Sequence, residues 1–450
     1  MAQGIFNQQG ASLRQPDGEA MQKALDLGGQ IKLDHSLFAE NENAGLNQLK
    51  YSSQGEKSSG LSDQLKVQIW GEHEWGRLQF CWKIDSSVLR GDLEMEKENK
   101  KENKIEEACI IWQPAPELRW YAGKKVFSWG KSHAWNPLGF LDSPRDPLDP
   151  DLPHTGLISL GAEYGQEFPP GPDPLQGLTF TSLIFPVQEK INKDFGHWKH
   201  WNLASKLSLL FWNTEIDFVA LTGKSRPDLY GFDFSRTLST SLEMYGDFWV
   251  SPQYEKVFLD QSGTLWETEY TAFGSLGGLR YERGNMCWTV EYYRNKAGFT
   301  PEEMLSYYHY LQTVVDAYPK KGADEAGQRM LILTNAYYQR PDLMQEYAYT
   351  QILKKDPFRI QHLSCSIAGV WNLQDQSLAL CPELQYDSKP NLNIGLKTIF
   401  WKGDPHTEFG EKANHWAVEA SLTYFFEFSF YYLPSTDEPR QDPSDTMYYR

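Results

Sequence analysis

The chain has 450 residues and a formal net charge of −17, with 40% hydrophobic and 14% aromatic residues. The negative charge disfavours a nucleic-acid partner, because phosphate binding needs a basic surface. No stretch approaches the roughly 18 uninterrupted apolar residues of a transmembrane helix. A mean hydropathy of −0.57 together with 16 Trp, 24 Tyr and 24 Phe favours a transmembrane β-barrel, which combines a polar lumen with aromatic girdles.

The N-terminal residues 1–27 are polar, and we expect a periplasmic or lumenal segment there. Residues 19–27 have the pattern of a short helix that ends at Gly28-Gly29. No secretory signal is visible, and Ala2-Gln3 suits the start of a mature chain after signal cleavage. The barrel is therefore expected to begin near residue 28.

Residues 65–84 show a pattern that recurs along the chain. Leu65 and Val67 alternate with polar neighbours, and the alternation resumes at Leu78 after a turn at Trp75-Gly76. A period of two places successive side chains on opposite faces of a strand. Two such runs joined by a tight turn predict an antiparallel hairpin.

We predict about sixteen to eighteen strands from this pattern. Closure of so large a sheet removes its exposed edges. The predicted fold is all-β, a single closed antiparallel transmembrane β-barrel over 28–428, with 429–450 as a C-terminal tail or last-strand extension. The runs lie near 28–38, 63–75, 77–88, 105–113, 117–127, 155–165, 177–186, 203–212, 214–222, 229–237, 239–250, 266–282, 285–296, 328–338, 358–371, 376–386, 390–402 and 414–428.

One column of each predicted strand is apolar and the other is polar. In an outer-membrane barrel the apolar column faces lipid and the polar column faces the lumen. A half-exposed soluble sheet gives the same alternation, so the number of strands carries more weight than any single strand. The predicted lipid-facing residues are Leu78, Phe80, Trp82, Trp288, Val290, Val418 and Leu422.

The connections between predicted strands differ in length on the two sides. Short turns fall on one side and long polar links mostly on the other, as expected for short periplasmic turns and long outer loops. Two links, 166–177 and 339–357, are too long for the short side, which indicates a missed strand pair or two real exceptions. Residues 301–317 have helical spacing and would form a helical loop or a lumen plug.

Residues 123–151 combine a strand end at Trp129-Gly130 with a stretch rich in proline and acidic residues. Proline lacks the donor that a sheet ladder needs, so we expect a stiff loop. Such a loop either folds into the lumen and narrows it, selecting permeants by charge, or stays at the surface. The candidate constriction residues are Lys131, His133, Arg145, Asp146, Asp149 and Asp151.

This stretch resembles a poorly characterised family of Gram-negative outer-membrane β-barrels whose genes often neighbour RND-type exporters of lipids or hydrophobic compounds. The resemblance also covers residues 403–410 and the run 416–426, which look like the closing loop and last strand of such barrels. One departure is that residues continue to Arg450 beyond the expected terminal aromatic. The residues that carry the motif are Gly123, Trp129, Gly130, Asn136, Pro137, Asp146, Pro147 and Asp149.

The sequence contains no motif that indicates an enzyme active site or a metal site. The pairs Glu267 with Glu269 and Glu215 with Asp217 have the residue type for glycoside hydrolysis, but spacing by two places both members on the lumen face, where charge is expected anyway. The histidines form no recognisable metal set, and no haem-attachment motif is present. Five cysteines at wide spacing predict no disulfide framework. We expect no enzyme activity and no cofactor.

The sequence therefore predicts a porin-like barrel in a bacterial outer membrane, in contact with membrane lipid, that provides a polar passage for solutes or for a partner. Two alternatives remain. One is a sheath that insulates a multihaem cytochrome, which would carry the haems itself; the other is a soluble secreted all-β protein that binds or cleaves carbohydrate. A periplasmic exporter component is the other partner considered.

Overall fold

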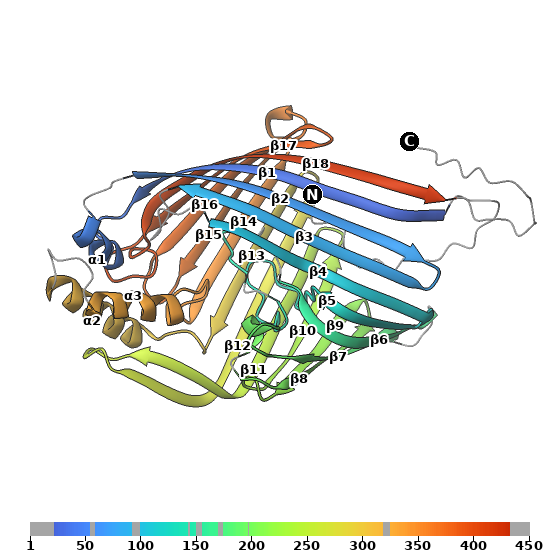
Figure 1. The fold of residues 1–450 in the computed structure, drawn as a ribbon, viewed down its shortest axis with the longest axis horizontal. Coiled ribbons are helices and arrows are strands. Elements are labelled where there is room, and N and C mark those ends of the chain that lie inside the picture. The colour runs from blue at the N-terminus through green and yellow to red at the C-terminus, as the bar shows by residue number, and fades with distance from the viewer. Residues whose placement is uncertain are drawn as a thin grey trace, which may run out of the picture.

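A computed structural model describes residues 22–54, 59–91, 100–142, 145–149, 155–169, 174–196, 198–317 and 325–432. These residues form one 18-stranded antiparallel sheet in which each strand pairs with its sequence neighbours. The first strand also pairs with the last, so the sheet closes on itself. The predicted closed barrel is confirmed, and Figure 1 shows its strands running obliquely around the wall.

The strands are β1 (Gln22–Glu40), β2 (Ser59–Trp75), β3 (Leu78–Gly91), β4 (Lys100–Ala115), β5 (Leu118–Lys125), β6 (Leu157–Glu167), β7 (Leu175–Pro186), β8 (Trp201–Phe211), β9 (Thr214–Gly223), β10 (Leu229–Ser239), β11 (Leu242–Leu259), β12 (Leu265–Arg283), β13 (Met286–Asn295), β14 (Glu346–Lys355), β15 (Leu363–Asn372), β16 (Leu378–Lys389), β17 (Leu392–Lys402) and β18 (Asn414–Tyr432).

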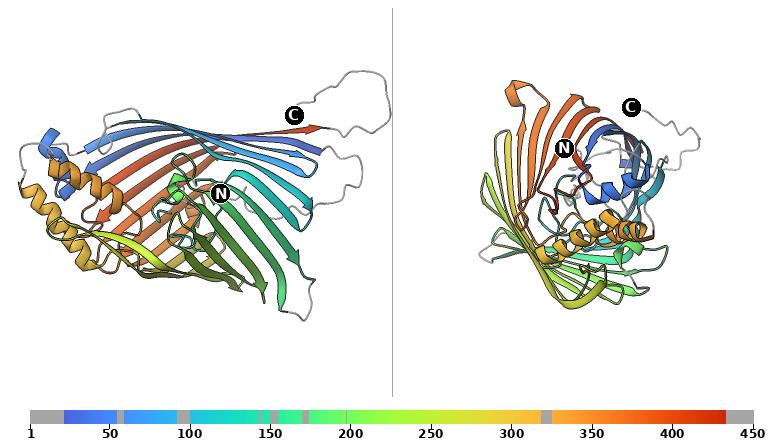
Figure 2. Two further views of the ribbon diagram at one scale, coloured as in Figure 1. Left: turned by 60° about the horizontal axis from the view of Figure 1, so that its bottom comes forward. Right: turned by 90° about the vertical axis from the view of Figure 1, so that its left-hand side faces the viewer.

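Helices gather at one end of the barrel. They are α1 (Gly45–Gln54), α2 (Pro301–Ala317) and α3 (Glu325–Tyr337), besides the short 3-10 turns Lys193–Phe195 and Pro357–Arg359. Figure 2 shows α2 and α3 lying across the mouth at this end, with α1 beside them. None of the helices that the structure describes is long and apolar enough to cross a membrane.

The connections are short at the opposite end. Gly76 and Gly284 take positive φ angles of 60° and 58° in two of these turns, a conformation that glycine adopts without the penalty of a Cβ atom. The long connections, with the helices, lie at the other end, as predicted for outer loops. The link predicted at 251–265 is shorter than expected, because β11 and β12 extend to Leu259 and from Leu265.

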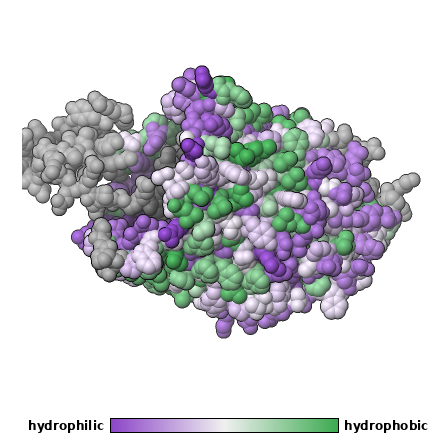
Figure 3. Space-filling model, turned by 180° about the vertical axis from the view of Figure 1, so that it is seen from behind, coloured by the Kyte–Doolittle hydropathy of each residue, from purple (hydrophilic) through white to green (hydrophobic). Residues whose placement is uncertain are grey.

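The wall presents apolar side chains outward. Among the predicted lipid-facing residues, Leu78, Phe80, Trp288, Val290 and Leu422 are exposed, whereas Trp82 and Val418 are half-buried. Figure 3 shows hydrophobic side chains gathered across the middle of the face in view and hydrophilic ones toward the helical end. An exposed apolar belt around a closed sheet matches the lipid-facing band of a membrane barrel.

Two expectations about β-structure were wrong in one region. Residues 328–338 were predicted as a strand, but 328–337 belong to α3, where Met330 and Leu333 are buried at helical spacing. The strand of this region is β14, which lies inside the supposed link 339–357. Its inward residues Tyr347 and Tyr349 are aromatic and buried, so the strand lacks the polar lumen column by which the others were recognised.

The termini of the barrel also differ from the prediction. Residues 22–27 form the start of β1 rather than the end of a helix, because Gln22 to Gly29 pair with Tyr432 to Phe426 of β18. The last strand continues to Tyr432. Of the expected N-terminal segment 1–27 and C-terminal tail 429–450, residues 1–21 and 433–450 lie outside the described residues.

Candidate functional site

The stretch 126–149, of which residues 143–144 are not described, lies inside the barrel; we call it the inserted segment. It leaves β5 and reaches strands on the far side of the wall. Its side chains and backbone contact β9, β11, β13 and β17. Because these strands lie at different places around a closed sheet, only a segment that crosses the interior can touch all of them.

Gly130 sets the direction of the inserted segment. Its φ of +96° is a left-handed value, and an added Cβ atom would lie 2.1 Å from Oδ1 of Asn136. Glycine is therefore required for the chain to turn inward and for Asn136 to pack against the turn. The Trp-Gly and Asn-Pro elements of the sequence motif thus meet in space.

Two carboxylates of the wall hold the backbone of the inserted segment. Asp247 on β11 accepts a hydrogen bond from the backbone N–H of Lys131, at 3.3 Å, and contacts the hydroxyl of Ser132. Glu291 on β13 accepts from the N–H groups of His133 and Ala134, at 2.7 and 3.1 Å. Hydrogen bonds to ionised acceptors are stronger than neutral ones, so these acids fix the segment at mid-wall.

The Lys131 side chain adds an ion pair with a third strand. Its Nζ lies 2.6 Å from Glu215 and 3.4 Å from Asp217, both on β9. Burial by itself lowers the pKa of Lys131, but the two carboxylates raise it overall. Glu215 and Asp217 had been considered as a catalytic pair; they share one face, as predicted, and bind this lysine.

Contacts within the inserted segment and an ion pair with β17 hold the second half of the segment. Arg145 donates to the backbone oxygen of Ser132 at 2.8 Å, and Asp149 pairs with Lys397 at 3.1 Å. Asp146 caps the turn by accepting from the N–H of Leu148 at 2.9 Å, and burial raises the pKa of its carboxyl.

The six candidate constriction residues therefore divide into groups. Lys131, Arg145, Asp146 and Asp149 make contacts that hold the inserted segment. His133 is exposed at its surface, and Asp151 lies outside the described residues.

Apolar side chains pack against one side of the inserted segment. Trp135 is 3% exposed, and its ring lies 5.2 Å from that of Tyr293 and 5.6 Å from that of Tyr347. A second cluster joins Phe127 and Leu138 to inward residues of the barrel wall. This half of the interior is a packed core, which the sequence reading of a wholly polar lumen did not foresee.

The wall formed by β1–β4, β17 and β18 is charged; we call it the charged wall. Its ion pairs join Lys32 to Asp34 at 2.9 Å and to Glu419 at 3.4 Å, Lys66 to Asp85 at 3.0 Å, and Lys83 to Glu106 at 2.9 Å. Each of these three lysines is paired, so positive and negative charges alternate across neighbouring strands. The polar column predicted for the lumen is present here.

Sequence reasoning missed the wall residues that hold the inserted segment. Asp247, Glu291 and Lys397 each occupy an inward position in a strand that was otherwise recognised. A buried charge in the middle of an inward column needs a partner. A charged residue at such a position could therefore have indicated a contact with a segment inside the barrel. Among the described residues, no group of three or more acidic, histidine or cysteine side chains is arranged to hold a metal.

Comparison with known proteins supports the architecture. The sequence matches no protein-family model and no curated protein. Among solved structures, OccK5 (OpdH) of Pseudomonas aeruginosa has a TM-score of 0.50 at 10% identity, over 90% of this chain and 98% of its own. OpdK of the same organism, crystallised with vanillate, has a TM-score of 0.50 at 7% identity, over 90% and 99%. At this identity the likeness concerns the fold.

Proposed function

We propose that the protein is a porin-like barrel of a bacterial outer membrane that provides a narrowed polar passage for solutes. The observation that carries the proposal is a closed barrel with an apolar outer belt and a loop clamped across its interior. OpdK, one of the proteins with the same fold, is described as an outer membrane protein. Charged groups at a constriction select permeants by sign, and we assign that role to Asp149 and Lys397.

The course of the passage follows from what fills the interior. The inserted segment packs against the walls of β5–β9 and β11–β16, where the two apolar clusters lie. The charged wall lies on the remaining side. We therefore propose that solutes move between the inserted segment and the charged wall, beside the Asp149–Lys397 ion pair that joins the two at 3.1 Å.

Single-channel recording in planar lipid bilayers tests this proposal. The wild-type protein should give discrete conductance steps, and Asp149→Asn should shift the reversal potential in a salt gradient toward anion preference, because Lys397 loses its partner. Asp260→Asn, at the tip of the β11–β12 hairpin, should leave the reversal potential unchanged. An ion preference unaffected by neutralising both Asp146 and Asp149 contradicts the proposed constriction.

The two alternatives are less well supported. A sheath for a multihaem cytochrome needs a free interior, and here the chain's own inserted segment lies across it. A soluble carbohydrate-binding protein would bury its apolar columns, whereas this barrel exposes them. Purification as a monodisperse protein without detergent would overturn the membrane proposal.

Partners other than lipid remain a prediction. The resemblance noted in the sequence suggests a periplasmic component of an RND-type exporter, and the sheath alternative suggests a cytochrome. Gentle detergent extraction followed by mass spectrometry of the co-purified proteins would identify either one. We ascribe no catalytic activity to the protein.

A further inference from the structure

Two of the five cysteines lie directly opposite each other in the barrel wall. Cys81 on β3 is the register partner of Cys109 on β4. Directly opposite residues of an antiparallel pair have Cα atoms about 4.5–5.5 Å apart, within the roughly 4.4–6.8 Å that a disulfide spans. A disulfide between these two positions would therefore require no change in the register of the two strands.

Both side chains point into the barrel. On β3 the neighbour Phe80 is exposed to the outside, and on β4 the neighbour Ile110 is exposed likewise. Successive residues of a strand alternate between faces, so Cys81 and Cys109 share the inward face. Cys109 is buried and Cys81 is half-buried.

The pair lies near the end of the barrel that carries the short turns. Cys81 is the fourth residue of β3, which follows the turn at Gly76-Arg77. The strands here belong to the charged wall rather than to the half that the inserted segment fills. A small reagent entering from this end would therefore meet Cys81, the half-buried member of the pair, within a few residues of the mouth.

The other three cysteines have no such partner. Cys287 faces Glu282 and Leu353 on its neighbouring strands, Cys365 faces Lys354 and Leu384, and Cys381 faces Ala368. They serve as internal controls in the same molecule.

We propose that Cys81 and Cys109 form an oxidisable cross-strand dithiol, whose disulfide covalently links β3 to β4. In the reaction a sulfur–sulfur bond forms between the two Sγ atoms while both S–H bonds break. Two electrons and two protons pass to the disulfide of an oxidant, which becomes two thiols. A small-molecule disulfide of an oxidising compartment is the class of oxidant that fits an inward-facing pair, and this part rests on the proposed outer-membrane location.

The test uses the folded, detergent-solubilised protein, with folding checked by its heat-modifiable gel mobility. It is treated with oxidised glutathione, denatured, alkylated with N-ethylmaleimide and analysed by peptide mass spectrometry. We expect a peptide cross-link between Cys81 and Cys109, with the mass lowered by two hydrogens, and full alkylation of Cys287, Cys365 and Cys381. The oxidised protein should also keep its folded mobility to a higher temperature than the reduced protein.

Cys81→Ser is the matched control, and it should abolish both the cross-link and the thermal shift while leaving Cys109 open to alkylation after denaturation. Full alkylation of Cys81 and Cys109 after oxidation would overturn the proposal, as would a cross-link of either residue to a third cysteine. The test is independent of transport. If the protein cross-links but gives no channel steps, the proposed function fails and the dithiol proposal stands. If it gives channel steps but does not cross-link, the dithiol proposal fails and the proposed function stands.

Discussion

At the scale of single residues, this barrel is organised by charges buried where strands and loops meet. Asp247 and Glu291 accept hydrogen bonds from backbone N–H groups of the inserted segment. Glu408, in the loop between β17 and β18, accepts hydrogen bonds from side chains of the barrel wall. Its Oε2 accepts hydrogen bonds from Tyr347 and Asn372 at 2.7 and 2.8 Å. Each of these acids joins a loop to an inward position on the wall.

Glu408 should make stability depend on pH. Burial raises the pKa of its carboxyl from 4.5 to about 7, although nearby Lys412 opposes the rise. The folded state therefore binds a proton that the unfolded state has lost, and about 3 kcal/mol of stability disappears as the pH rises from 4.5 to 7. Urea titrations of the protein in lipid vesicles at several pH values measure this loss.

Glu408→Gln keeps an acceptor oxygen for Tyr347 but cannot ionise, so it should flatten the pH dependence across this window. Glu189→Gln, in an exposed pair with Lys199, should retain the wild-type slope. An identical slope in the wild-type protein and Glu408→Gln would refute the assignment.

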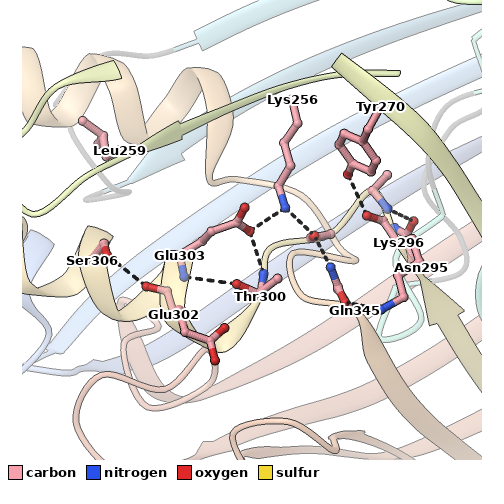
Figure 4. Close-up of polar contacts among 12 residues, drawn as sticks. Lys256, Leu259, Tyr270, Asn295, Lys296, Thr300, Glu302, Glu303, Ser306 and Gln345 are labelled. Carbon is pink, nitrogen blue, oxygen red and sulfur yellow. Dashed lines mark hydrogen bonds and ion pairs between the residues drawn. The ribbon is translucent and has the colours of Figure 1, made fainter. Parts of the chain in front are cut away.

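At the scale of elements, the helices α1, α2 and α3 form a group at one end of the barrel, which we call the helical cap. The β11–β12 hairpin joins this cap to the barrel. Lys256 on β11 donates to the backbone oxygen of Gly298 at 2.8 Å and pairs with Glu303 of α2 at 2.5 Å. Glu303 also accepts from the N–H of Thr300, whose hydroxyl accepts from the N–H of Glu303 (Figure 4). This reciprocal capping box begins α2, and Lys256 ties it to the wall.

Lys256→Ala should loosen α2 without unfolding the barrel. Lys256 is 6% exposed, and loss of a buried partner leaves Glu303 with an uncompensated charge, at a cost of about 2 kcal/mol for this partly exposed pair. Hydrogen exchange over 301–317 should quicken, while exchange in β1–β4 stays slow. Lys199→Ala removes an exposed pair and should change neither. Equal exchange in α2 of the wild-type and Lys256→Ala proteins would count against this connection.

The elements also show where sequence patterns suffice and where they fail. Strands such as β3 and β13 were predicted because one column faces lipid and the other carries polar groups. β14 was missed because its inward Tyr347 and Tyr349 pack against Trp135, a contact between residues far apart in the chain. The apolar run of α3 was taken for a strand, since its burial depends on α2 beside it.

The candidate site was predicted only in part for the same reason. The motif around Gly130 and Asn136 marked the inserted segment, and the lumen face of Glu215 and Asp217 followed from their spacing. The pairing of Asp149 with Lys397 joins positions 248 residues apart in the sequence. No local pattern specifies such a contact, because it depends on the closed shape of the sheet.

At the scale of the whole molecule, the outer belt should determine where the protein is stable. Val290 lies midway along β13 on the outward face and is 38% exposed. An arginine on the lipid face near the bilayer centre costs about 2–4 kcal/mol. Val290→Arg should therefore lower the free energy of unfolding in lipid vesicles by that amount, as measured by urea titration.

Leu305→Arg provides the control for Val290→Arg. Leu305 is exposed on α2, in the cap outside the belt, and arginine there should have almost no effect on unfolding. If both variants lost the same stability, the belt would not be in contact with hydrocarbon.

The pairing of β1 with β18 has a consequence for biogenesis. Register partners in this ladder run from Gln22 with Tyr432 to Glu40 with Asn414. The ring cannot close until β18, the last strand in the chain order, has been synthesised. Until β18 pairs with it, β1 has unpaired donors and acceptors along one edge, and such an edge invites aggregation. The seam is therefore the last part of the wall to be protected.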